Sequence, residues 1–69
     1  MPKTLPPIAR NVRKYRKKLG VSQDRLSKLA DITLHTLTKI ESGATADPRI
    51  ETVNKLANAL GVTLDDLMK

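Results

Sequence analysis

The stretch SQDRLSKLADITLHTLTKIESG, residues 22–43, decides the fold of this 69-residue chain. Its apolar residues recur three and four positions apart on both sides of a two-residue turn, which is the spacing of two amphipathic helices. Ser22 and Thr33 stand where N-cap residues accept a backbone hydrogen bond. We therefore predict one helix over residues 22–30, capped by Ser22, and a second over residues 34–42, capped by Thr33.

The second of these helices has an unusual outer face. Leu37 and Ile40 are its inward anchors, whereas short or polar side chains occupy the opposite side: His35, Thr38, Lys39 and Ser42. Thr is a poor helix former, so this face lowers helical propensity without enlarging the core. A tight turn followed by a helix with a polar outward face is typical of a helix-turn-helix. Short polar side chains would let such a helix approach base edges in a major groove; an ordinary solvated face is the alternative.

The remaining sequence also divides into short helical segments. Gly20 and Gly61 are placed as C-terminal stops, and Thr63 as a further N-cap. The predicted segments cover residues 6–20, 49–61 and 63–69, with a loop at 43–48. No stretch alternates as a half-buried strand would. We predict an all-α fold, a compact single domain of five helices over residues 1–69 with residues 1–6 as a short N-terminal arm.

The predicted core consists of the apolar stripes on these helices. Its residues are Ile8, Val12, Tyr15 and Leu19, then Leu26, Leu29 and Ala30, then Ile50, Val53, Leu56, Ala57 and Leu60. A core from so short a chain typically supplies only ~3–5 kcal/mol, so support from a partner subunit would be unsurprising.

Charge is concentrated in the first part of the chain. The net charge is +6 and the pI is near 10.1. Residues 1–20 contain seven Lys and Arg residues and no Asp or Glu, whereas the remaining sequence is close to neutral. A localised basic surface suggests a polyanionic partner, either nucleic acid or an anionic membrane. A face that serves only solubility is the alternative.

Several classes of function find no support in the sequence. The chain has no Cys and a single His, so no metal cluster is expected. It also lacks a Gly-rich phosphate loop, and adjacent Asp65 and Asp66 diverge by about 100° on a helix, which is unsuited to paired-carboxylate catalysis. We therefore expect neither an enzyme nor a cofactor. No apolar run approaches a membrane span and no signal peptide is recognisable, so a cytoplasmic setting is expected.

Five short motifs together carry a family resemblance. They are SQ at residues 22–23, LA at 29–30, IESG at 40–43, Pro48 in the following loop, and LANALGV at 56–62. With them, residues 8–68 resemble the Cro/C1-type (XRE) helix-turn-helix domain of lambdoid phage repressors and small bacterial regulators. The resemblance implies a lambda-repressor-like five-helix domain with a central helix-turn-helix. It further implies a transcriptional regulator, most simply a repressor, that binds double-stranded operator DNA as a two-fold homodimer.

The resemblance assigns phosphate contacts to residues at the helix ends. Ser22 and Gln23 match the start of the second helix, where a glutamine touches a phosphate and braces the recognition helix. Ser42 and Gly43 match the end of that helix, although Gly43 also suits a left-handed stop. Arg49 matches an arginine that faces the minor groove, with an ordinary surface charge as the alternative.

Base reading falls by position to the outer face of the recognition helix, namely Leu34, His35, Thr38 and Lys39, with Thr36 a weaker candidate. Lys39 and His35 are expected to donate to guanine, or His35 to bridge to a phosphate. Leu34 departs from the glutamine of several relatives and offers only apolar contact, for instance with a thymine methyl group.

The resemblance also implies two structural contacts. Arg16 and Glu41 lie at the edges of their apolar stripes and are expected to form a partly buried ion pair. The dimer interface is expected in the C-terminal part, with Ile50, Leu64, Leu67 and Met68 as candidates, and is expected to strengthen on DNA.

Two departures from the family pattern bear on the structure. Asp31 occupies the turn position where relatives usually have Gly, so a positive φ is expected there. Ala46 and Asp47 replace basic loop residues of some relatives. This shifts the expected electrostatic contribution to the first helix, through Arg10, Arg13, Lys14 and Lys17.

Two other functions remain open at this stage. Small domains of this type also serve as antitoxins that bind a toxin partner and their own promoter. A membrane-surface role for the basic first helix is disfavoured, because the chain lacks the Trp and Phe that interfacial helices prefer.

Overall fold

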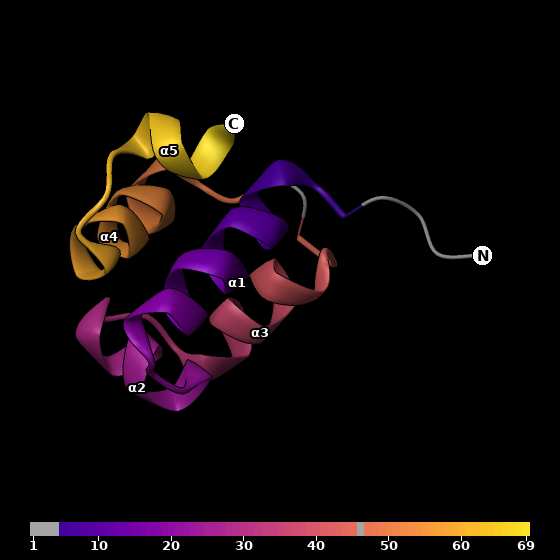
Figure 1. Cartoon of the computed structure of the whole chain (residues 1–69). Coiled ribbons are helices and arrows are strands. Elements are labelled where there is room, and N and C mark those ends of the chain that lie inside the picture. Colours follow the sequence, from indigo (N-terminus) through magenta and orange to yellow (C-terminus); the bar gives the residue numbers. More distant parts are fainter. Residues whose placement is uncertain (1–4, 46) are drawn as a thin grey trace.

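The computed structural model describes residues 5–45 and 47–69, and it confirms the predicted all-α fold with five helices (Figure 1). In chain order these are α1 (Pro7–Leu19), α2 (Gln23–Leu29), α3 (Leu34–Ser42), α4 (Ile50–Leu60) and α5 (Leu64–Met68). None of the helices in these two ranges is both long and apolar enough to cross a bilayer. The predicted N-terminal arm lies largely outside the described residues.

Side-chain caps set the helix starts at the predicted positions. The Ser22 hydroxyl accepts a hydrogen bond from the backbone N–H of Arg25 at 3.1 Å, and the Thr33 hydroxyl accepts one from that of Thr36 at 3.1 Å. Each cap satisfies a backbone donor that has no partner inside its helix. The short interval between Leu29 and Thr33 therefore ends one helix and starts the next within a tight turn.

Asp31 sits in this turn with φ 58°, the only positive φ among the described non-glycine residues. The prediction made from its family position is therefore confirmed. The backbone N–H groups of Asp31 and Ile32 donate to the carbonyls of Lys28 and Ser27, which closes the last turn of α2. A left-handed residue here redirects the chain sharply toward α3.

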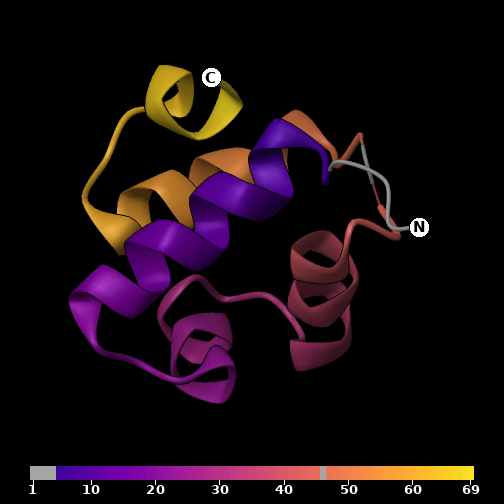
Figure 2. The ribbon, with the colours of Figure 1, turned by 45° about the vertical axis from the view of Figure 1, so that its right-hand side comes forward.

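α1 runs through the middle of the molecule, with α3 on one side and α4 and α5 on the other (Figure 2). Apolar residues from all five helices meet around it. The buried set comprises Ile8, Ala9, Val12, Leu26, Ala30, Leu37, Ile40, Val53, Leu56, Ala57, Leu60 and Leu67. The predicted stripes therefore form one continuous core.

Three residues predicted to face the core do not. Leu19 and Leu29 are each 50% exposed, and Ile50 is 65% exposed. Leu19 and Leu29 end their helices, and Ile50 begins α4. A helical stripe passes beyond the neighbouring helix at its ends, so the period alone overestimates burial there.

Leu67 corrects a different prediction. It was a candidate for the dimer interface, but the structure buries it completely in the core of its own chain. The Asn11 side-chain amide donates to the Leu67 carbonyl at 2.7 Å, which fastens α5 to α1. The prediction failed because so short a helix needs one fully buried anchor before it can pack at all.

Candidate nucleic-acid interface

The outer face of α3 presents the predicted base-reading residues to solvent. His35, Thr38 and Lys39 are exposed, and Leu34 is 42% exposed. Thr36 is half-buried, and its hydroxyl accepts a hydrogen bond from the Thr33 hydroxyl at 2.8 Å. The structure thus brings four of the five candidates onto one accessible face and leaves Thr36 at its edge.

Hydrogen bonds within α3 hold the hydroxyl groups of this face in place. The Thr38 hydroxyl donates to the Leu34 carbonyl at 2.8 Å, and the Ser42 hydroxyl donates to the Lys39 carbonyl at 3.1 Å. A hydroxyl that donates its proton in this way still has lone pairs with which to accept another hydrogen bond. The two hydroxyls are therefore oriented acceptors at fixed positions along the helix.

A partly buried polar network fixes α3 relative to α1 and α2. Two guanidinium nitrogens of Arg16 donate to the Glu41 carboxylate, Nε at 2.7 Å and Nη2 at 3.1 Å. The Gln23 side-chain amide donates to the same carboxylate at 3.0 Å, and Arg16 Nη1 donates to the Val21 carbonyl at 2.9 Å. The predicted pair of Arg16 and Glu41 is thus present, with the two side chains 14% and 3% exposed.

The network also shows how Gln23 braces α3. Sequence reasoning expected this support from the resemblance but did not identify Glu41 as the residue to which Gln23 bonds. The amide nitrogen carries two protons, and Glu41 takes one of them. The other proton and the side-chain oxygen are left for a further partner beside the first turn of α2, where backbone N–H groups lack intrahelical acceptors.

A shallow hollow at the junction of α1, α2 and α3 gathers several of these residues. Its lining consists of Arg13, Arg16, Gln23, Thr38, Glu41 and Ser42. Sequence reasoning recognised Arg13 as part of a basic helix but did not assign it to the interface. The usable signal was its position three residues before Arg16, because residues three apart lie on neighbouring parts of one helix face.

The remaining phosphate candidates lie at other helix ends. Ser22 is exposed at the start of α2. Gly43 ends α3 with φ 85°, and a Cβ added there would lie 3.0 Å from the Leu5 side chain and 3.2 Å from Pro6, so Gly43 has a structural role as well. Arg49 is exposed at the start of α4. Of the two departures in the loop, Asp47 is exposed and Ala46 lies outside the described residues.

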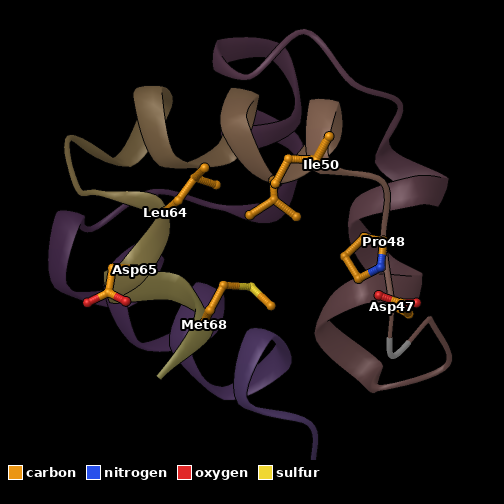
Figure 3. Close-up of a pocket in the computed structure, with 7 residues that line it drawn as sticks. Asp47, Pro48, Ile50, Leu64, Asp65 and Met68 are labelled. Atoms are coloured by element: carbon orange, nitrogen blue, oxygen red, sulfur yellow. The ribbon is translucent and has the colours of Figure 1, made fainter.

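An apolar hollow lies between α4 and α5. Figure 3 shows Ile50, Leu64 and Met68 around it, with Asp47 and Asp65 at its edge. Met68 is 50% exposed and Leu64 is half-buried. Three of the four predicted dimer residues therefore share one accessible apolar surface, which we call the α4–α5 hollow.

Comparison with known proteins identifies relatives of the chain. A model of a helix-turn-helix family matches residues 12–67. Over 58 residues the chain is 40% identical to the "SPbeta prophage-derived uncharacterized HTH-type transcriptional regulator YonR" of Bacillus subtilis (strain 168), a match that covers 84% of this chain and 53% of that protein. The chain therefore spans about half the length of this relative. No solved structure matches the chain significantly.

Proposed function

Because the chain belongs to the helix-turn-helix family, as its motifs predict, we propose that it is a transcriptional regulator that binds a specific sequence of double-stranded DNA. The observation that carries this proposal is the partly buried network of Arg16, Glu41 and Gln23. It locks the exposed polar face of α3 to the first turn of α2. Base reading requires such a fixed relation, because phosphate contacts set the register in which base edges are read.

In this proposal α3 lies in the major groove. Lys39 and His35 donate to guanine O6 or N7, and Thr38 offers its hydroxyl to a base or its methyl group to thymine. Leu34, exposed at the start of α3, makes an apolar contact with a thymine methyl group. The absence of glutamine at position 34 gives this regulator a target sequence different from those of relatives that read adenine there.

Phosphate contacts lie on both sides of the groove. Gln23 donates its remaining amide proton to a phosphate, beside Ser22 and the free N–H groups of α2. At the other end of α3, the Ser42 hydroxyl takes the equivalent role by turning its proton from the Lys39 carbonyl toward a phosphate, beside the backbone of Gly43. Arg49 reaches the minor groove between half-sites, where its positive charge is favoured.

The regulator binds its operator as a two-fold dimer through the α4–α5 hollow. Ile50, Leu64 and Met68 of one copy cover the same residues of the other, which removes apolar surface from water on both. Two α3 helices then address half-sites one helical turn apart, roughly 34 Å. Occlusion of the polymerase from an overlapping promoter makes the protein a repressor.

Selection of bound sequences from random duplexes tests the proposal. We expect a selected site with two-fold symmetry, bound more tightly than a scrambled duplex. Lys39→Ala should reduce the difference in binding free energy between the selected and the scrambled duplex by about 1–3 kcal/mol, because it removes a base contact. Gln23→Ala should weaken binding to both duplexes by a similar factor, because phosphate contacts carry no direct sequence information.

Lys69→Ala serves as the control, since this exposed lysine follows α5, which packs on the other side of α1 from α3 (Figure 2). It should leave the gap between selected and scrambled duplexes unchanged. A protein that selects no sequence, or a Lys39→Ala variant that discriminates as wild type does, would contradict base reading by α3.

A further inference from the structure

Four cations form a stripe along α1 that the proposed function does not use as a unit. They are Arg10, Arg13, Lys14 and Lys17, and we call them the basic stripe. Their spacing of three and four residues places them on one side of the helix, and all four are exposed. Among the ion pairs of the described residues, only the one between Arg16 and Glu41 involves α1. The charge of the stripe is therefore not neutralised locally.

The basic stripe is continuous with the candidate nucleic-acid interface through Arg13. This residue lines the hollow that holds Gln23, Thr38 and Ser42. It also lines a second hollow with Leu5 and the other three members of the stripe. At about 100° per residue, Arg13 follows Arg16 around the helix by roughly 60°, and Lys17 follows Arg13 by roughly 40°. The cations thus lead away from the side of α1 that packs against α3.

We propose that the basic stripe contacts phosphates of the duplex that flank the half-site read by α3; this rests on the proposed function. A DNA backbone that passes Gln23 and Arg13 meets the rest of the stripe as it leaves the groove. Each phosphate neutralised by a cation releases condensed counterions, so the stripe adds affinity without adding sequence preference. The stripe thereby compensates for the loop before α4, where this chain has Asp47 in place of the basic residue of some relatives.

The stripe fits a duplex better than an anionic membrane. A helix that lies in a bilayer surface needs an apolar face directed at the lipid, and the apolar face of α1 is buried in the core through Ile8, Ala9 and Val12. The exposed side of α1 is instead polar up to Leu19 at its end. Its continuity with the base-reading side is what a bound duplex requires.

The test compares two DNA lengths at several salt concentrations. One duplex ends at the edges of the selected site, and the other extends it by roughly 10 base pairs on each side. Lys14→Gln/Lys17→Gln should flatten the salt slope of the extended duplex by about 3.6, because each of the two bound copies loses two phosphate contacts and each contact contributes about 0.9. The same variant should bind the trimmed duplex with the wild-type slope.

Two matched variants separate the stripe from net charge and from folding. Lys55→Gln/Lys69→Gln removes the same amount of charge, from α4 and from residue 69. It should leave the difference in salt slope between the extended and the trimmed duplex unchanged. Lys14→Arg/Lys17→Arg keeps the charge and should retain the wild-type slope on both. All four lysines are exposed, so thermal unfolding should confirm that each variant folds.

Equal slopes for wild type and Lys14→Gln/Lys17→Gln on the extended duplex would overturn the proposal. So would a loss of binding to phosphatidylserine vesicles with binding to the extended duplex unaltered, because the stripe would then serve a membrane. A wild type that cannot tell the operator from a scrambled duplex contradicts the proposed function instead. In that case the salt slope on an extended scrambled duplex still tests the stripe, because phosphate contacts do not depend on sequence, and Lys14→Gln/Lys17→Gln should flatten it.

Discussion

The α2–α3 pair and the α4–α5 pair both pack on α1, but they leave opposite kinds of surface exposed. α3 presents polar and basic side chains such as Thr38 and Lys39. The other pair presents apolar ones, with Ile50 at 65% exposure and Met68 at 50%. The helices of both pairs bury an apolar face against the core, so the presence of that face does not explain the difference. The residues left outside the core are what distinguish a surface suited to DNA from one suited to protein.

The two pairs also differ in how they are held. Charge-assisted hydrogen bonds from Arg16 to Glu41 tie α3 to α1, and these groups are almost fully removed from water. α5 is held by one buried anchor, Leu67, and by the Asn11 amide. A base-reading helix has to keep its position closely, whereas an apolar surface that meets a second copy tolerates small shifts. The two helix pairs are therefore expected to respond differently when the interactions that hold them are removed.

Loss of one member of the buried pair should have the largest effect. Arg16→Ala leaves the Glu41 carboxylate buried with only Gln23 as a partner, so the free energy of unfolding should fall by about 3 kcal/mol. Urea denaturation measures this value. Lys17→Ala, on the exposed side of the same helix, should change it by less than about 0.5 kcal/mol.

A double-mutant cycle then separates the pair from other effects of truncation. Combined with Glu41→Ala, Arg16→Ala should cost much less than the two single changes added together, because the second truncation removes the unpaired charge. A coupling energy near zero would mean that the two side chains contribute independently. The contrast between the two helix pairs would then lose its energetic basis.

Much of this contrast could be predicted from the sequence. Caps at Ser22 and Thr33 and the stops at Gly20 and Gly61 are local properties of residue type, whereas the positive φ at Asp31 was expected from its position in the family pattern. The pairing of Arg16 with Glu41 came from the family resemblance, since periodicity places each only at the edge of a stripe. The exposed face of α3 followed from the same period that placed Leu37 and Ile40 inward.

What the sequence could not supply depends on where helices stop against one another. The exposure of Leu29 and Ile50 follows from where the neighbouring helices end, and the burial of Leu67 from the shortness of α5, which needs a buried anchor. The bond from Gln23 to Glu41 joins residues that are 18 positions apart and lie in different helices. Periodicity describes one helix at a time, so contacts between helices lie beyond its reach.

An acidic side chain in the α4–α5 hollow should have an intermediate effect. Ile50→Glu would place a charge at the two-fold interface and should reduce affinity for the full operator by about 2 kcal/mol, the scale of burying an apolar side chain. Affinity for a single half-site should change much less, because one copy suffices there. Titration of both duplexes measures the difference.

Leu19→Glu is the matched control for this change. Leu19 is also an exposed aliphatic residue, but it lies at the end of α1 outside the α4–α5 hollow. The substitution adds the same negative charge and should weaken full operator and half-site alike. If Leu19→Glu and Ile50→Glu reduce full-operator affinity equally, the hollow is not where two copies meet.

The smallest effect should come from the capping box of α5. The Thr63 backbone N–H donates to Asp66 Oδ2 at 3.1 Å, while the Thr63 hydroxyl accepts from the Asp66 N–H at 3.0 Å. The hydrogen bond from the Thr63 backbone is the main reason that the pKa of the Asp66 carboxyl is lowered, and nearby Lys69 lowers it further. Because the folded chain lowers this pKa, the ionised carboxylate stabilises the fold at neutral pH.

That contribution should disappear in acid. It is complete above the ordinary Asp pKa of about 3.9 and is lost as the pH falls through the lower folded-state value. Asp66→Asn should therefore have a lower free energy of unfolding than wild type at pH 7. This difference in free energy should close below pH ~4. Thr63→Ala removes the hydroxyl acceptor, a loss of about 1 kcal/mol, and it also removes the side-chain hydrogen bond that helps to lower the Asp66 pKa, so only part of its destabilisation should persist in acid. Urea denaturation of all three proteins from pH 7 into acid gives the difference in free energy of unfolding between wild type and each variant. A gap for Asp66→Asn that stays constant over this range would show that the carboxylate charge does not stabilise α5, so that Leu67 and Asn11 hold it without pH-dependent support.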